Sequence, residues 1–134
     1  MVLVDTNVLM DVLQDDPVWA RWSQRQLDIA AARGRLVINP VVYAELSIAF
    51  ERIEELEDVM EATGLLLEEL PREALFLAGK VSLGYRRRRG SNKQGILPDF
   101  FIGAHAAVRG VPLLTRDARR YSAYFPTVEV IGPR

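Results

Sequence analysis

The stretch VLVDTN, residues 2–7, sets the pattern for the whole chain. Its apolar residues 2–4 form a short strand, and a carboxylate, Asp5, follows them directly. In open sheets of parallel strands, ligands bind beyond the carboxyl ends of the strands. Asp5 therefore stands where a functional side chain is expected, provided that the rest of the chain supplies such a sheet.

Strand and helix patterns alternate along the rest of the chain. Short apolar runs predict strands at residues 2–4, 35–38, 65–70, 111–115 and 127–132. Apolar residues at helical spacing, with capping and stop residues around them, predict helices at residues 8–14, 18–33, 41–53, 54–63, 71–89, 99–110 and 117–125. This alternation is typical of an α/β fold with a mainly parallel sheet, here of four to five strands.

Two of the predicted helices begin with a capping signal. Thr6 or Asn7 can cap the helix at residues 8–14, because each side chain can accept a hydrogen bond from free N–H groups. Asn39 followed by Pro40 has the form of an N-cap with proline in the first turn. Both signals place a helix directly after a strand.

Length and composition narrow the class of protein. The 134 residues suit a single domain, residues 1–134, and nearly half of them are apolar. The 17 basic and 18 acidic residues almost cancel, so the net charge does not indicate nucleic-acid binding. Without cysteine there is no disulfide or thiolate metal site. The start lacks a signal peptide and no apolar run approaches the ~20 residues of a membrane span, so we expect a soluble, cytoplasmic protein.

Four acidic residues lie in unusually apolar surroundings. Asp5 follows MVLV, Glu45 lies within VVYAELSIAF, Asp99 lies within ILPDFFIGA, and Asp117 follows VPLLTR. Asp5 could be a turn or cap residue, and Asp99 and Asp117 could simply begin helices. Glu45 could pair with an arginine. The predicted topology nevertheless brings Asp5 and Asp117 to one edge of the sheet, where Thr115 adds a hydroxyl.

Carboxylates gathered in one pocket repel one another and take up protons unless a cation compensates them. Oxygen ligands alone favour a hard ion, Mg²⁺ or Mn²⁺, over zinc. The single histidine, His105, lies six positions after Asp99 and points about 120° away around that helix, which indicates a structural role. A hard ion held by few carboxylates and several waters suits phosphate chemistry, so the acids indicate a nuclease.

Four segments of the chain match a known family. They are VDTNVLMDVL at residues 4–13, VVYAELS at 41–47, LPDFFIGAHA at 97–106 and LLTRDARRYSAYFPTVEVI at 113–131. In this order and spacing, the chain resembles the PIN-domain ribonucleases, in particular the VapC toxins of bacterial toxin–antitoxin pairs. The resemblance implies a three-layer α/β/α sandwich and an acidic centre that binds Mg²⁺ or Mn²⁺ and cuts RNA.

The resemblance also implies roles for single residues. The acids of the family's centre match Asp5, Glu45, Asp99 and Asp117, and its hydroxyl residue matches Thr115. We expect Asp5 and Asp99 to bind the metal directly and Asp117 to bind the same or a second ion. Glu45 would bind metal or act as the general base, and Thr115 would position water or a phosphate oxygen.

Further expectations follow from the same resemblance. Asn7 would orient the groups that bind the metal. Gly103 stands where many relatives have alanine. One turn after Asp99 on the same helix, it is also expected to leave open space beside that acid. Relatives usually form homodimers and bind a VapB-type antitoxin that blocks the acidic pocket, so both a homodimer and such an antitoxin are expected partners.

Basic residues near one predicted loop are candidates for RNA contact. The run YRRRRGSNK, residues 85–93, ends a helix, and arginine binds phosphate with two hydrogen bonds in a salt-dependent way. The alternative is a solvated helix end, where cations are favoured by the helix dipole. The candidates are Arg86, Arg87, Arg88, Arg89, Lys93 and Arg116.

Two other functions fit parts of the pattern. A Mg²⁺-dependent phosphatase would use Asp5 as a nucleophile, but such enzymes usually carry a second acid two residues later, where this chain has Asn7. A non-catalytic subunit that binds RNA or protein would keep the pocket without turnover. The full set of acids favours the ribonuclease over both.

Overall fold

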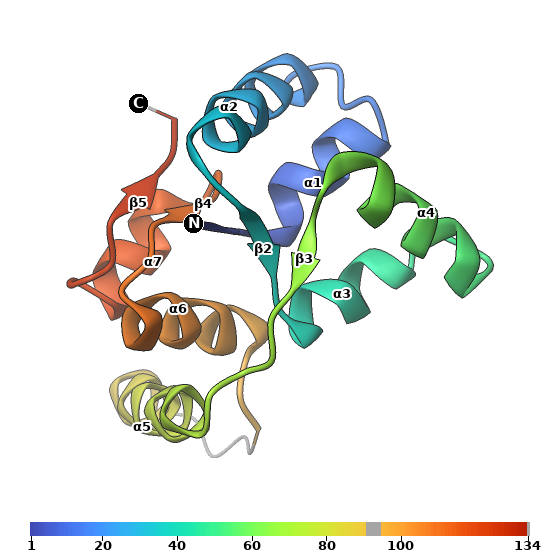
Figure 1. Cartoon of the computed structure of the whole chain (residues 1–134). Coiled ribbons are helices and arrows are strands. Elements are labelled where there is room, and N and C mark those ends of the chain that lie inside the picture. Colours follow the sequence, from blue (N-terminus) through green and yellow to red (C-terminus); the bar gives the residue numbers. More distant parts are fainter. Residues whose placement is uncertain (91–94, 134) are drawn as a thin grey trace.

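The computed structural model describes residues 1–90 and 95–133, and within them five strands form one sheet (Figure 1). The strands are β1 Val2–Val4, β2 Leu36–Ile38, β3 Leu66–Leu67, β4 Leu113–Leu114 and β5 Val130–Ile131. Their order is β3-β2-β1-β4-β5, and every neighbouring pair is parallel. The predicted parallel sheet is therefore confirmed, with β1 at its centre and Asp5 at the carboxyl end of β1.

Helices cover the two faces of this sheet. They are α1 Thr6–Leu13, α2 Ala20–Arg33, α3 Pro40–Ser47, α4 Ile53–Thr63, α5 Arg72–Arg89, α6 Pro98–Arg109 and α7 Ala118–Tyr124. Helices α1 and α2 pack together on one side and α5 and α6 on the other, which confirms the α/β/α sandwich (Figure 1). None of the described helices has both the length and the apolar content that a membrane span requires.

Of the two predicted helix caps, one is confirmed and the other is wrong. Asn39 caps α3, because its Oδ1 accepts a hydrogen bond from the Val42 N–H at 3.0 Å, and Pro40 follows as predicted. The prediction that Thr6 or Asn7 caps α1 is wrong, because α1 already begins at Thr6. Its N-cap is Asp5, whose Oδ1 accepts from the Thr6 N–H at 2.7 Å.

The helix predicted at residues 41–53 is also shorter than expected. It ends at Ser47, whose hydroxyl donates to the Ala44 carbonyl at 2.6 Å and so competes with the helical hydrogen bonds. A new helix, α4, then begins after Arg52, where the Glu55 carboxylate accepts from the Arg52 N–H at 2.9 Å. Local side-chain bonds thus end the first of the two predicted helices early, at Ser47, and begin the second at Ile53.

The core lies on both faces of the central strands. The residues of β2 and β4 are buried, as are Leu3 and Val4 of β1, which explains why these strands are continuous apolar runs. The space that the missing side chain of Gly103 leaves is filled by Phe125. A Cβ added at Gly103 would overlap the ring of Phe125, so this glycine permits close packing between α6 and the residue that follows α7.

Candidate functional site

One pocket at the carboxyl edge of the sheet collects all four predicted acids. It has a volume of about 250 Å³ and is lined by Asp5, Thr6, Asn7, Glu45, Asp99 and Asp117. These residues come from the end of β1, the start of α1, and helices α3, α6 and α7. The parallel topology produces this convergence, because the helices that follow neighbouring strands begin at the same edge.

Asp5 is the most buried of the four acids. Its side chain is 5% exposed, and its Oδ2 accepts a hydrogen bond from the Thr115 hydroxyl at 2.7 Å. The pKa of Asp5 is raised to about 6, mainly by burial and also by the nearby charge of Asp99, while the hydrogen bonds from Thr115 and Thr6 oppose the rise. Asp5 is therefore a carboxylate whose charge needs a compensating cation.

Asp99 lies in the first turn of α6 beside an arginine. The Arg120 Nε lies 2.9 Å from Oδ2 of Asp99 in an ion pair, although its N–H is not in hydrogen-bonding geometry. Both side chains are about one-third exposed, at 37% and 32%, so water screens this pair and makes it weak. A stronger cation can therefore compete with Arg120 for Asp99.

Glu45 and Asp117 lack the interactions that would give them a purely structural role, an arginine partner for Glu45 and a capping hydrogen bond for Asp117. Glu45 is half-buried, and its Oε1 accepts a hydrogen bond from the Thr6 hydroxyl at 2.6 Å rather than from an arginine. Asp117 occupies the N-cap position of α7, but its exposed side chain makes no capping hydrogen bond. Both carboxylates keep acceptor capacity toward the pocket.

Thr115 and Asn7 connect the two strand ends beneath the acids. The buried Thr115 Oγ1 donates to Asp5 and accepts from the Asp117 N–H at 3.0 Å and from Asn7 Nδ2 at 3.4 Å. The Asn7 Oδ1 accepts from the Arg116 N–H at 3.2 Å. These bonds hold the first and last acids in a fixed relation, as expected of residues that orient a site.

The pocket fits a hard cation that keeps much of its water. Within residues 1–90 and 95–133, no three acidic or histidine side chains are arranged to hold one ion together. An ion would therefore contact few carboxylates directly and complete its shell with water, as Mg²⁺ commonly does. An oxygen-only donor set and a desolvated Asp5 both suit such a guest.

Arg116 is engaged outside the pocket. Its guanidinium donates two hydrogen bonds to Asp11, at 2.7 and 3.0 Å, and lies over the Trp19 ring at 5.1 Å. Asp11 is 3% exposed and also accepts from the Ser23 hydroxyl at 2.7 Å. The sequence analysis did not single out Asp11, although its apolar surroundings, VLMDVL, resemble those of the four acids.

The arginines at the end of α5 remain at the surface. Arg87, Arg88 and Arg89 are exposed, with Arg88 over the Tyr124 ring at 5.3 Å and Arg89 over the Tyr85 ring at 5.5 Å. Arg86 is partly buried in the same turn. Lys93, the remaining candidate from this run, falls outside the described residues.

His105 lies away from the acidic pocket. It is 1% exposed, with Nδ1 3.2 Å from the Asn39 amide nitrogen and Nε2 2.9 Å from Oε1 of Glu68. Since Asn39 Oδ1 already accepts from the backbone of α3, its amide nitrogen donates to Nδ1, and Nε2 therefore carries the proton given to Glu68. His105 thus joins α6 to the ends of β2 and β3.

Sequence reasoning missed two polar residues beside the acids: Thr6 and Tyr121. Tyr121 follows Asp117 by four positions, the spacing that shares a helix face, and this spacing was an available signal. The hydrogen bond between Thr6 and Glu45 joins residues 39 positions apart, and no local sequence pattern predicts it.

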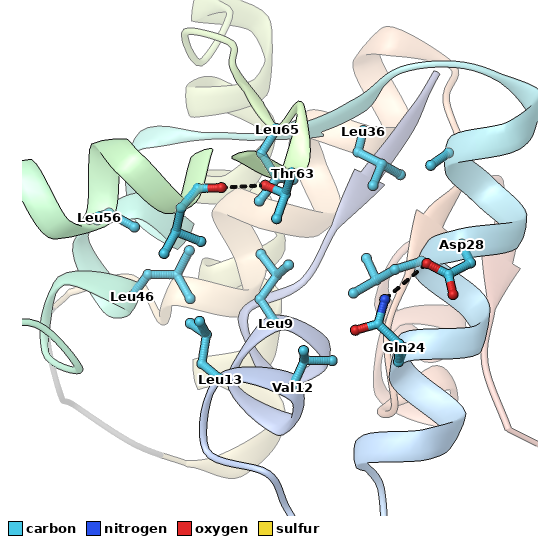
Figure 2. A pocket seen from close by; sticks show the side chains of 13 residues that line it. Leu9, Val12, Leu13, Gln24, Asp28, Leu36, Leu46, Leu56, Thr63 and Leu65 are labelled. Carbon is cyan, nitrogen blue, oxygen red and sulfur yellow. Dashed lines mark hydrogen bonds between the residues drawn. The ribbon is translucent and has the colours of Figure 1, made fainter. Parts of the chain in front are cut away.

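A second, apolar pocket lies between α1, α2 and α4 (Figure 2). Its volume is about 180 Å³. Figure 2 shows Leu9 and Leu13 of α1 between Leu46 and Leu56 on one side and Gln24 of α2 on the other. We call this the apolar groove. It shares α1 with the acidic pocket, since Asp5 is the N-cap of that helix and Thr6 is its first residue.

Comparisons with known proteins give a family match and several similar solved structures. The family model described as PIN domain matches residues 2–126. The chain is similar in structure to VapBC2 from Rickettsia felis bound to a DNA fragment from their promoter, with a TM-score of 0.72 and 17% identity over 100% of both chains. It is also similar to a toxin–antitoxin complex from Klebsiella pneumoniae, with a TM-score of 0.66 and 20% identity over 100% of this chain and 98% of that one.

A third similar structure is FitAcB from Neisseria gonorrhoeae, with a TM-score of 0.65 and 21% identity over 99% of this chain and 98% of that one. At such identities the likeness establishes the fold. Among curated protein sequences, none matches the chain significantly.

Proposed function

The chain belongs to the PIN domain family, and from that premise we propose that it is a metal-dependent endoribonuclease, the toxin of a VapC-type toxin–antitoxin pair in the cytoplasm. The observation that carries the proposal is the convergence of Asp5, Glu45, Asp99 and Asp117 on one pocket. Four carboxylates that destabilise one another are costly to a fold, so their gathering favours a function that needs a cation.

The proposed cofactor is Mg²⁺ or Mn²⁺. Such an ion supplies activation of the attacking water and neutralises charge on the attacked phosphate. Asp5 and Asp99 are the proposed direct ligands, and Asp117, exposed at the mouth of the pocket, binds the same or a second ion. Glu45 is close enough to the pocket to accept a proton, while Thr115 holds Asp5 in orientation.

RNA is the proposed substrate. Arg88 and Arg89, exposed at the end of α5, lie over Tyr124 and Tyr85. The rings of both tyrosines contact Phe100, the residue after Asp99. This aromatic cluster connects the basic surface to the acidic pocket. A phosphate chain bound along the arginines would therefore pass near the carboxylates.

A VapB-type antitoxin is the proposed partner, and the apolar groove is a surface on which such a partner can dock. The similar solved structures include toxin–antitoxin complexes, which supports a partner of this kind. Leu13 in the groove is 37% exposed, so a bound apolar segment would remove it from water. A homodimer is a further part of the proposal.

Asp5→Asn tests the catalytic proposal. We expect the purified full chain to cleave single-stranded RNA in Mg²⁺ or Mn²⁺ and the variant to lose most of that activity, because the amide cannot hold the ion's charge. The measurement is RNA cleavage over a panel of RNAs, with retained structure checked by circular dichroism. Asp58→Asn, at an exposed position of α4, is the matched control and should cleave like the wild type.

Cleavage by Asp5→Asn at the wild-type rate would reject the proposal. One observation is compatible with the non-catalytic alternative: among the described residues, no three carboxylates are placed so that they could hold one metal ion. That alternative predicts RNA or antitoxin binding without cleavage by the wild type in either metal. The phosphatase alternative is disfavoured because the position two residues after Asp5, where such enzymes usually carry a second acid, holds Asn7.

A further inference from the structure

Arg120 on α7 places a positive charge beside the acidic pocket. Its Nε lies 2.9 Å from Oδ2 of Asp99, one of the acids that line the pocket. Asp5 and Glu45 instead accept hydrogen bonds from uncharged groups. Among the residues that the structure describes, Arg120 is the one basic side chain at ion-pair distance from any of the four acids. It is therefore the charge that partly neutralises the pocket in the metal-free protein.

The packing of two helices fixes this contact. Asp99 stands in the first turn of α6, and Arg120 follows Asp117 by three positions, the spacing that shares a helix face. Helices α6 and α7 pack together, and the ring of Phe100 on α6 meets the ring of Phe125, directly after α7, edge-on with 6.5 Å between their centroids. Arg120 therefore reaches Asp99 from well-packed elements rather than from a loop.

A divalent ion in this pocket would use the same carboxylate as Arg120. Oδ2 of Asp99 already faces the guanidinium, and two cations that share one carboxylate repel each other. The two side chains are about one-third exposed, at 37% and 32%, so water screens their attraction and the pair is weak. A doubly charged ion therefore displaces the guanidinium from Asp99, but it binds less tightly than it would to a free carboxylate.

We propose that Arg120 is a resident counter-ion of the metal site: it pairs with Asp99 in the metal-free protein, yields this carboxylate to a divalent ion and thereby lowers the affinity of the pocket for that ion. The inference rests on the metal site of the proposed function and assigns it a residue that sets its affinity. An arginine that only held Asp99 in place would raise the affinity for the ion instead. The sign of its effect on metal binding therefore decides between the two roles.

Arg120→Gln tests the sign of this effect. Glutamine keeps a polar side chain but has no charge with which to hold Asp99. The dissociation constant for Mn²⁺, measured by calorimetry on the purified full chain, should fall about fivefold, the ratio that corresponds to an ion pair of about 1 kcal/mol. Mn²⁺ should also raise the melting temperature, relative to EDTA, by more in the variant than in the wild type, because tighter binding stabilises the folded state more.

Two control variants separate the contact with Asp99 from net charge and from packing. Arg119→Gln removes the same charge at an exposed position of α7 that forms no ion pair in the described part of the chain. Its dissociation constant for Mn²⁺ should stay within about twofold of the wild type, because salt screens an exposed charge without a direct contact. Arg120→Lys keeps a positive charge that can reach Asp99, and it should also stay within about twofold of the wild type.

Three results would overturn the inference: equal or weaker Mn²⁺ binding by Arg120→Gln than by the wild type, a gain as large in either control variant, or a wild type that binds no Mn²⁺. The two proposals can also fail separately. If Arg120→Gln alone binds Mn²⁺ more tightly and the wild type cleaves no RNA in Mn²⁺, the counter-ion role holds and the ribonuclease function fails. If the wild type cleaves RNA in Mn²⁺ and Arg120→Gln binds the ion with unchanged affinity, the ribonuclease function holds and the counter-ion role fails.

Discussion

The carboxylate of Asp5 contributes both to the fold and to the candidate site. One oxygen caps α1 through Thr6, and the other accepts from Thr115 across 110 positions of sequence. With a pKa of about 6, an ionised Asp5 at neutral pH weakens the ion-free fold. A residue that costs stability unless a cation is near is typical of functional sites.

The raised pKa of Asp5 predicts a pH dependence with a definite sign. In the unfolded chain this carboxyl ionises near pH 4, and in the fold at about 6. Between these values the folded state binds more protons, so the contribution of Asp5 to stability falls as pH rises. Asp5→Asn removes this loss, and its free energy of unfolding in EDTA, relative to wild type, should increase by about 2–3 kcal/mol from pH 4 to pH 7.

Urea unfolding of both proteins at several pH values measures this difference. It should level off above pH 7, where Asp5 is ionised in both states. A difference that stays constant from pH 4 to pH 7 would contradict the raised pKa and with it the claim that Asp5 is an uncompensated charge.

Helix α6 shows how an element positions a functional acid. Pro98 begins it, Asp99 stands in its first turn, and Gly110 ends it in a left-handed conformation with φ 64°. Along the same helix, Gly103 brings the backbone against Phe125, and His105 ties it to Glu68. The position of Asp99 therefore depends on packing along the whole helix rather than on its first turn alone.

Gly103→Ala should destabilise the protein even though alanine favours helices. The added Cβ overlaps the Phe125 ring, and such overpacking costs about 1–3 kcal/mol. Gly84→Ala on α5 is the control, because no atom lies within 4 Å of its added Cβ. It should stabilise the protein by about 0.5–1 kcal/mol through helix propensity. Thermal and urea unfolding measure both, and equal signs would reject the packing argument.

A buried polar network joins the first and last parts of the molecule. Asp11 of α1 accepts from Ser23 of α2 and from Arg116 directly after Thr115. Arg116 also covers the Trp19 ring, which meets Trp22 edge-on. Through these contacts the first two helices are fixed to the strand end that presents Asp117.

The network predicts different outcomes for two arginines that the sequence analysis treated alike. Arg116→Gln should lower the free energy of unfolding by about 2 kcal/mol, because it leaves the buried Asp11 with one partner. Arg87→Gln, at an exposed position of α5, should leave it within about 0.5 kcal/mol but weaken RNA binding and its salt dependence by about one ion. Urea unfolding and RNA titrations at several salt concentrations measure both. Unchanged stability with weakened RNA binding in Arg116→Gln would instead support its predicted RNA contact.

Local patterns in the chain were sufficient to predict an α/β fold with a mainly parallel sheet and to single out the acids. Apolar runs and helical spacing located the strands and helices, and carboxylates in apolar company located Asp5, Glu45, Asp99 and Asp117. The ends of the helices were less predictable. The sequence predicts helix at residues 48–52, but a hydrogen bond of the Ser47 hydroxyl ends one helix before this segment, and a hydrogen bond of the Glu55 carboxylate begins the next helix after it.

Such local patterns could not predict contacts between residues that are far apart in sequence. The partners of Arg116, the pairing of Arg120 with Asp99 and the closeness of Gly103 to Phe125 all depend on how helices rotate and pack around the sheet. The physical reason is that periodicity reports which face of an element is apolar. Which polar atom meets which is settled by the packing of side chains far apart in sequence.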